Sequence, residues 1–97
     1  MRLPSIYELV ELIPQKQDGL ITAHKLASLT KASEPNIRKI INEARTKGIP
    51  ICSTRRGYYL SNEYNDIAKT ITFLTNRLCT QLQAISGLQK RLQEVEQ

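Results

Sequence analysis

Apolar side chains recur at intervals of three or four residues in three stretches of the first half of the chain. This spacing puts them on one face of a helix, and it predicts helices over about residues 5–13, 23–29 and 34–47. Ser5, Thr22 and Ser33 favour N-caps at the three starts, and Ser5-Ile-Tyr-Glu8 has the form of a capping box. The apolar positions are Ile6, Leu9, Val10, Ile13, Ala23, Leu26, Ala27, Leu29, Ile37, Ile40, Ile41 and Ala44.

After Gly48 the pattern changes to the alternation of a strand. Two β-favouring runs, 49–54 and 58–60, are joined by Arg55-Arg56-Gly57, a turn that ends in glycine. They predict a β-hairpin with two arginines at its tip, and Pro50 confines its strand to an edge. Leu20-Ile21, between the first two helices, is long enough only for a single bridging strand.

A second helical pattern starts at Asn62 or Asn65, each a suitable N-cap, and runs almost to the end of the chain without proline. Its residues fit about four heptads, with Ile71, Leu78, Ile85 and Leu92 at a and Ile67, Leu74, Gln81, Leu88 and Val95 at d. A helix of about 30 residues is about 45 Å long, more than a small domain covers. We therefore expect residues 61–97 to form a coiled coil with other copies of the chain, parallel or antiparallel and two-stranded or larger. The alternative is a helix that breaks at Ser86-Gly87 and folds back on itself.

The positive charge lies in the first part of the chain. The 97 residues include 14 Lys+Arg and 9 Asp+Glu, for a formal net charge of +5. Residues 1–60 hold ten basic and five acidic side chains, whereas residues 61–97 hold four of each. The stretch from Lys31 to Arg56 alone accounts for the excess, which predicts a polyanionic partner such as nucleic acid. The alternative is a solvated basic surface without such a partner.

The composition argues against catalysis, metal binding and membrane insertion. A chain with no Trp, one Phe, one Met and one His has few side chains with which to build a catalytic pocket. Cys52 and Cys79 lack ligand spacing and His24 has no second ligand nearby, so we expect reduced thiols, no metal and no cofactor. No apolar run reaches membrane length, and Pro4 and Glu8 interrupt the run that a signal peptide would need. We expect a cytoplasmic protein that is not an enzyme.

Three ordered pieces carry a resemblance to a known family. They are Ala23-His-Lys-Leu-Ala-Ser-Leu-Thr-Lys-Ala-Ser33, the pattern Ser33-x-x-x-Ile37-x-Lys39-x-Ile41-x-x-x-Arg45-x-x-Gly48, and Arg56-Gly57-Tyr58-Tyr59-Leu60. This segment resembles the winged helix-turn-helix family, most closely the N-terminal DNA-binding domain of biotin-repressor-type proteins. The resemblance implies a mostly α fold with a small β-hairpin (α+β), in which residues 1–60 form the winged helix-turn-helix domain and the long C-terminal helix follows. No biotin-ligase activity is implied.

The resemblance also implies a mode of DNA binding. The third helix would lie in the major groove, and an angle of about 100° per residue turns Arg38, Lys39 and Asn42 outward from the Ile37 face. The second helix would brace it with Lys25 near a phosphate, and the hairpin arginines would reach an adjacent groove or the backbone. The predicted DNA-binding residues are Lys25, Ser33, Arg38, Lys39, Asn42, Arg55 and Arg56.

These expectations combine in one function. We expect a sequence-specific double-stranded DNA-binding protein, a small dimeric transcriptional regulator of a phage or mobile-element type. The predicted oligomerisation residues are Ile67, Ile71, Leu74, Leu78, Gln81, Ile85, Leu88 and Leu92. The alternative is a protein-interaction module, such as a phage-encoded inhibitor or a replication or assembly adaptor, that binds a host or phage protein. The cations on the third helix and the hairpin tip favour DNA.

Tyr7 and Tyr64 are expected to pack against apolar neighbours.

Overall fold

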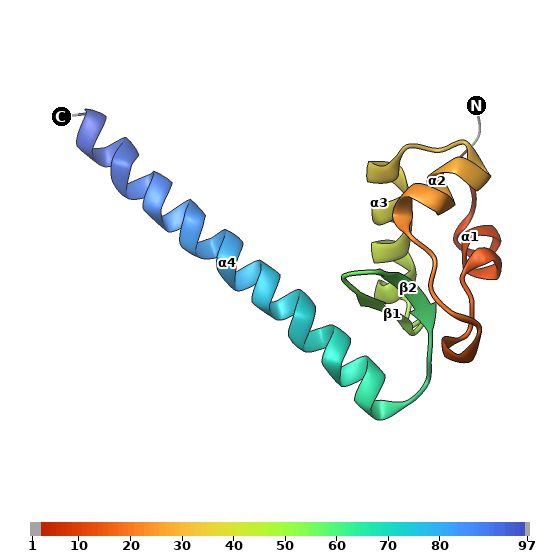
Figure 1. Ribbon diagram of the computed structural model, residues 1–97. Helices are drawn as coiled ribbons and strands as arrows, with labels where there is room; N and C mark the ends of the chain where they lie inside the picture. The colour runs from red at the N-terminus through yellow and green to blue at the C-terminus, as the bar shows by residue number, and fades with distance from the viewer. Residues whose placement is uncertain (1–2, 97) are drawn as a thin grey trace.

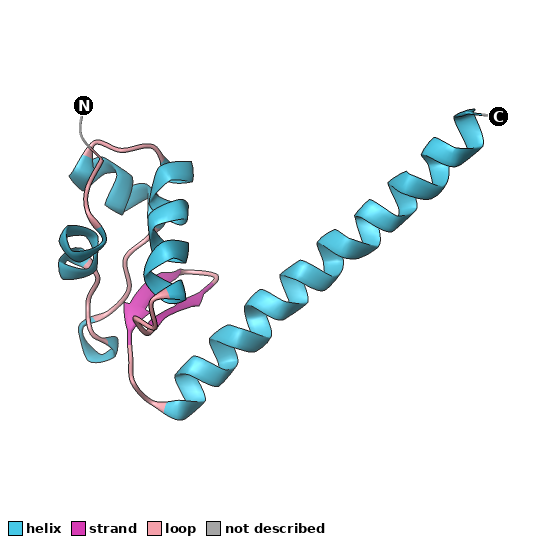
Figure 2. Ribbon diagram, turned by 180° about the vertical axis from the view of Figure 1, so that it is seen from behind, coloured by secondary structure: helices cyan, strands magenta, loops and turns pink. Residues whose placement is uncertain are grey.

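The computed structural model describes residues 3–96 and contains four α-helices and one antiparallel hairpin (Figures 1 and 2). The elements in chain order are α1 (Ile6–Leu12), the 3₁₀ turn η1 (Lys16–Asp18), α2 (Ala23–Thr30), α3 (Glu34–Thr46), β1 (Ile51–Thr54), β2 (Gly57–Leu60) and α4 (Tyr64–Glu96). The mostly α fold with a small hairpin and a long C-terminal helix is confirmed.

The first three helices begin at the N-caps that the sequence predicts. The hydroxyl oxygens of Ser5, Thr22 and Ser33 each accept a hydrogen bond from the backbone N–H three residues later, at 3.1, 3.0 and 3.3 Å. Each bond satisfies one of the N–H groups that a helix start leaves without an intrahelical partner. The turn from α2 to α3 is short because Lys31 adopts a left-handed backbone conformation, with φ of 60°.

One apolar core lies between α1, α2, α3 and the start of β1. Its buried members are Leu9, Ile13, Leu26, Ile37, Ile40, Ile41, Ala44 and Ile51. The opposite face of α3 is exposed, as the helical period predicts, and carries Pro35, Arg38, Lys39, Asn42 and Thr46. The core therefore holds α3 in place while leaving its cationic face open.

The hairpin is fixed to the segment between α1 and α2. Ile51 pairs with Leu60 and Thr54 with Gly57. Ile21 forms a single bridge, as its short run predicts, and its partner is Tyr58. Gly57 lies so close to this bridge that a Cβ atom would come within 2.6 Å of the Ile21 carbonyl oxygen, and its φ is +152°. Only glycine fits this close approach without displacing the backbone.

Four local predictions are wrong. The first strand begins at Ile51 rather than at residue 49, because Pro50 has no N–H to donate to a ladder. Neither Asn62 nor Asn65 is the N-cap of α4, which begins at Tyr64. Tyr7 and Tyr64 do not pack as expected, since their exposed fractions are 69% and 83%.

A buried polar network joins the start of α4 to the rest of the fold. The Ser61 hydroxyl donates to Asp66 Oδ2 at 2.7 Å, and Lys16 Nζ lies 3.0 Å from the same oxygen. The hydroxyl of Thr70 donates to the Asp66 carbonyl and accepts from the Ser53 N–H of β1. This network, rather than an Asn cap, determines where α4 begins and in which direction it leaves the hairpin.

Beyond this anchor α4 projects from the domain. Every residue from 74 to 96 is exposed, a length of roughly 35 Å at the rise of an α-helix. The helix continues through Ser86 and Gly87, so the alternative of a fold-back at this point is wrong. Figure 1 shows α4 diverging from α3, with the hairpin at the narrow end between them.

We expect the Asp66 network to make stability depend on acid pH. The hydrogen bond from Ser61 and the ammonium of Lys16 hold the pKa of Asp66 below its ordinary value. A carboxylate whose pKa is lowered on folding stabilises the fold fully above the unfolded pKa of about 3.9, and this contribution disappears as pH falls through the lower folded value. Glu63 and Tyr59 also face this carboxylate, and burial raises the pKa of Tyr59.

The measurement is urea unfolding of the wild type and Asp66→Asn from about pH 2 to pH 7. The free energy of unfolding should be lower for Asp66→Asn at neutral pH and should fall less steeply with acid. Glu94→Gln removes an exposed carboxylate that pairs with Arg91 at 3.1 Å, and it serves as the control. Parallel pH curves for the wild type and Asp66→Asn would contradict the prediction.

Candidate nucleic-acid interface

The exposed face of α3 forms one wall of a groove whose other wall is α4. Arg38, Lys39 and Asn42 line this groove, which has a volume of about 530 Å³. The α4 wall consists of Leu74, Arg77, Leu78 and Gln81. We call this cavity the α3–α4 groove. Three of the predicted DNA-binding residues are therefore together, and they lie opposite α4.

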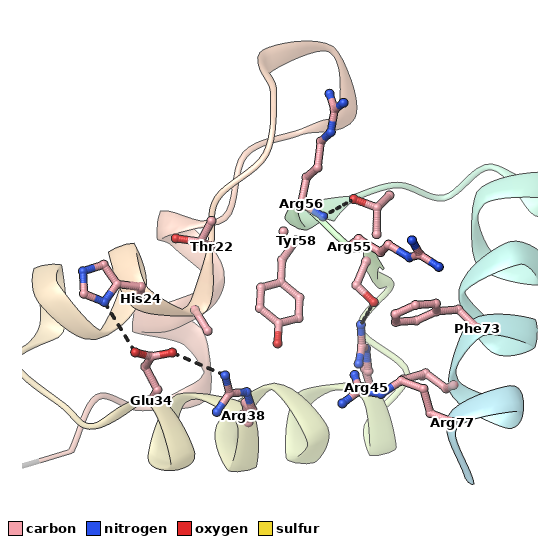
Figure 3. A pocket seen from close by; sticks show the side chains of 15 residues that line it. Thr22, His24, Glu34, Arg38, Arg45, Arg55, Arg56, Tyr58, Phe73 and Arg77 are labelled. Carbon is pink, nitrogen blue, oxygen red and sulfur yellow. Dashed lines mark hydrogen bonds and ion pairs between the residues drawn. The ribbon is translucent and has the colours of Figure 1, made fainter. Parts of the chain in front are cut away.

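A second cavity lies at the narrow end, where the start of α2, α3, the hairpin and α4 meet (Figure 3). We call this cavity the arginine cleft, and its volume is about 410 Å³. The arginines that line it are Arg38, Arg45, Arg55, Arg56 and Arg77. Glu34 is the one carboxylate among its lining residues. Even without Arg56, whose side chain extends away from the others, four arginines against one carboxylate give this lining an excess of positive charge, which favours an anionic ligand.

Glu34 partly neutralises the α3 side of the cleft. Its carboxylate lies 3.3 Å from Arg38 Nη2 and 3.4 Å from His24 Nδ1. These groups are all substantially exposed, so water screens the pairs and a competing phosphate can displace them at little cost. Within residues 3–96, no carboxylate pairs with Arg45, Arg55, Arg56 or Arg77.

Arg45 positions the hairpin against α3. Its Nε donates to the Ile51 carbonyl at 2.8 Å and its Nη2 to the Ser53 hydroxyl at 3.1 Å. The guanidinium also lies 5.8 Å from the centre of the Tyr58 ring. Burial lowers the pKa of Arg45, but an arginine keeps its charge at neutral pH. Arg45 therefore combines a structural role with a contribution to the potential of the cleft.

Arg77 reaches the cleft from α4. Its guanidinium carbon lies 5.6 Å from the centre of the Phe73 ring, one helical turn earlier on the same helix. Figure 3 shows Arg45, Arg55 and Arg77 gathered around Phe73, whereas the side chain of Arg56 extends away from them. Arg77 and Phe73 are not among the residues that the sequence predicts for this site. In the sequence, the one sign of a role for Arg77 is its place directly before Leu78 at an a position. The heptad periodicity does not show that α4 faces α3, so it does not place Arg77 in the cleft.

The other two predicted DNA contacts, Lys25 and Ser33, lie outside both sets of lining residues. Lys25 is exposed in the first turn of α2, where its backbone N–H donates to Thr22. The Ser33 hydroxyl is engaged as the N-cap of α3 through the Asn36 N–H. The other five predicted residues line one cavity or the other: Arg38, Lys39 and Asn42 line the α3–α4 groove, and Arg38, Arg55 and Arg56 line the arginine cleft.

The predicted oligomerisation residues divide into two groups. Ile67, Ile71 and Leu74 line an apolar cavity of about 280 Å³ beside residues 48–52 of their own domain. The apolar a and d residues further along α4 are about half exposed or more, and they are Leu78, Ile85, Leu88, Leu92 and Val95. Leu82 beside them is also about half exposed. Gln81 is also exposed. Leu74, Leu78 and Gln81 face α3, so the stripe and the cationic face of α3 share one groove.

Metal binding, the two cysteines and membrane insertion are the other features that the sequence raises. In the described part of the chain, no cluster of three His, Cys, Asp or Glu side chains is placed to hold a metal ion. Cys52 is buried and Cys79 exposed, and both are free thiols. None of the helices in residues 3–96 has the length and hydropathy of a membrane span. The chain matches no protein-family model, no curated protein sequence and no solved structure.

Proposed function

We propose that this protein binds double-stranded DNA in a sequence-specific manner and acts as a dimeric regulator of transcription. The observation that carries the proposal is the grouping of Arg38, Lys39 and Asn42 on the exposed face of α3, beside the hairpin arginines. The order of α2, a tight turn, α3 and a hairpin is the arrangement that helix-turn-helix proteins use to insert their second helix into the major groove.

The side chains on α3 suit both specificity and affinity. An arginine can form a bidentate pair with guanine and an asparagine with adenine, each worth about 1–3 kcal/mol of discrimination. Lys39 would add phosphate attraction that depends on salt. Asn42 lies one helical turn after Arg38 on the same face, so the two side chains would address neighbouring base pairs.

The exposed stripe of α4 supports dimer formation. From Ile85 to Val95 the a and d residues Ile85, Leu88, Leu92 and Val95 follow the heptad spacing, are about half exposed or more, and lie outside the lining of the α3–α4 groove. A second copy of α4 would cover them and bring two α3 helices to one DNA site. Linking two modules in this way raises affinity by about 10²–10⁴ without new contacts.

DNA binding over a salt series tests the proposal. We expect the purified protein to bind the DNA upstream of its own coding sequence more tightly than random duplex of equal length. The logarithm of the binding constant should fall linearly with the logarithm of the salt concentration, with a slope of about −0.9 per phosphate contact. If a folded sample binds neither duplex at about 50 mM salt, the proposal is refuted and the protein-interaction alternative takes its place.

A further inference from the structure

Some guanidinium groups of the arginine cleft have neither a hydrogen-bonding partner nor a counter-ion in the described residues. Arg45 is committed to the hairpin and Arg38 to Glu34. For Arg55 and Arg77 the structure shows no side-chain hydrogen bond or ion pair within residues 3–96. Like charges held in one cavity repel each other, so their convergence is favourable mainly when an anion lies between them.

Arg77 is also oriented toward the cleft before any ligand binds. The Phe73 ring, which is half-buried, lies beneath the guanidinium at 5.6 Å and restrains it by a cation–π contact. Arg55 extends toward the same ring from the tip of the hairpin (Figure 3). A donor that is already oriented loses less conformational entropy on binding than a free side chain does.

We infer that Arg55 and Arg77 form a phosphate site that binds the DNA backbone beside the groove entered by α3. This inference rests on the proposed function. The major groove is about 12 Å wide, so a helix inside it has a sugar–phosphate backbone on each side. On the hairpin side of α3 that backbone meets the arginine cleft, whose far wall is α4. Guanidinium groups match phosphate geometry with two parallel hydrogen bonds.

The consequence is that α4 contacts DNA as well as a second copy of the chain. Arg77 lies one residue before Leu78, a member of the exposed stripe, and both residues line the α3–α4 groove. Its contact with a phosphate would hold α4 at a fixed angle to α3. The angle of α4 in turn determines how far apart the two α3 helices of a dimer lie.

The test removes the charge of Arg77 and compares it with a matched arginine on the same helix. Arg77→Gln should lower the magnitude of the salt slope by about 0.9 and weaken binding at about 100 mM salt by roughly 5- to 10-fold. Arg77→Lys should keep the slope, because it keeps the charge. Arg91→Gln is the control, since Arg91 is 74% exposed on the free half of α4 and pairs with Glu94. Light scattering and circular dichroism follow mass and helix content.

The outcomes separate the inference from the proposed function. Absence of DNA binding by the wild type would refute the proposed function, and this inference with it. Wild-type binding with equal slopes for the wild type and Arg77→Gln would overturn the phosphate site alone. If Arg77→Gln lowers the mass, the comparison between the Gln and Lys variants is made at a protein concentration where both are oligomeric. Equal slopes for those two variants would likewise overturn the inference.

Discussion

Replacing Leu88 with Asp is expected to dissociate the protein into monomers and to weaken binding to specific DNA by about 100-fold or more. Leu88 is 71% exposed at a d position of the free part of α4. In a coiled coil this side chain enters a hole of the facing helix, so the variant would bury a carboxylate in each chain without a partner. Each α3 would then bind its half-site alone, and the affinity gained by linking two DNA-binding domains in one dimer would be lost.

Leu88 is a better target than Leu78 because Leu78 also lines the α3–α4 groove. A carboxylate at position 78 would also repel DNA directly, so the loss of dimerisation could not be separated from a direct loss of DNA affinity. Gln83→Asp, at an outward f position of the same exposed helix, is the matched control and should change neither mass nor affinity. Light scattering measures the mass and fluorescence anisotropy the binding. If Leu88→Asp keeps the mass of the wild type, the heptad assignment is refuted.

The local part of this fold follows from the sequence because its determinants are close together in the chain. Each N-cap hydroxyl binds an N–H three residues away, and the Ile37, Ile40, Ile41 and Ala44 stripe reflects one helical period. The same period places Arg38, Lys39 and Asn42 on the exposed face. A reader of the sequence needs no tertiary information to find them.

The direction of α4 does not follow from the sequence, because residues far apart in the chain set it. Lys16 binds Asp66 and Glu63 across more than forty positions, and Thr70 binds the backbone of β1. Each of these side chains looks like an ordinary surface residue in the sequence. This network decides that α4 faces α3, and hence that Arg77 belongs to the arginine cleft. The misplaced N-cap and the exposed Tyr64 arise at the same junction.

The junction also changes how the heptad pattern is understood. The sequence shows one apolar stripe from Ile67 onward, whereas in the structure its first three members lie beside their own hairpin. An apolar residue at a heptad position can cover either a partner helix or its own domain, and spacing alone does not distinguish the two. The structure distinguishes them by what they line: Ile67, Ile71 and Leu74 line a cavity of their own domain, although Ile71 is 59% exposed, a larger fraction than the 55% of Leu78.

The double substitution Arg38→Ala and Lys39→Ala is expected to reduce the ratio of specific to random DNA binding by roughly 10- to 100-fold, because a lost bidentate base contact costs about 1–3 kcal/mol. The magnitude of the salt slope should also fall, by about 0.9, because Lys39 is expected to contact a phosphate while Arg38 pairs with a base. The fold should be unaffected, because both side chains are exposed and the Arg38–Glu34 pair is a solvent-screened surface contact.

Lys90→Ala with Arg91→Ala is a closely matched control. It also removes two consecutive cations from an exposed helix face and changes the net charge by the same amount, but on the free half of α4. If both double variants lose the same affinity for every duplex, the effect is one of net charge and α3 does not read the sequence. If only the Arg38 and Lys39 variant loses its preference for the specific site, α3 provides the base contacts. The preference for the specific site depends on the geometry of the α3 side chains, whereas long-range attraction to DNA depends on the net charge wherever it lies. The ratio of specific to random binding therefore separates base recognition from net-charge attraction.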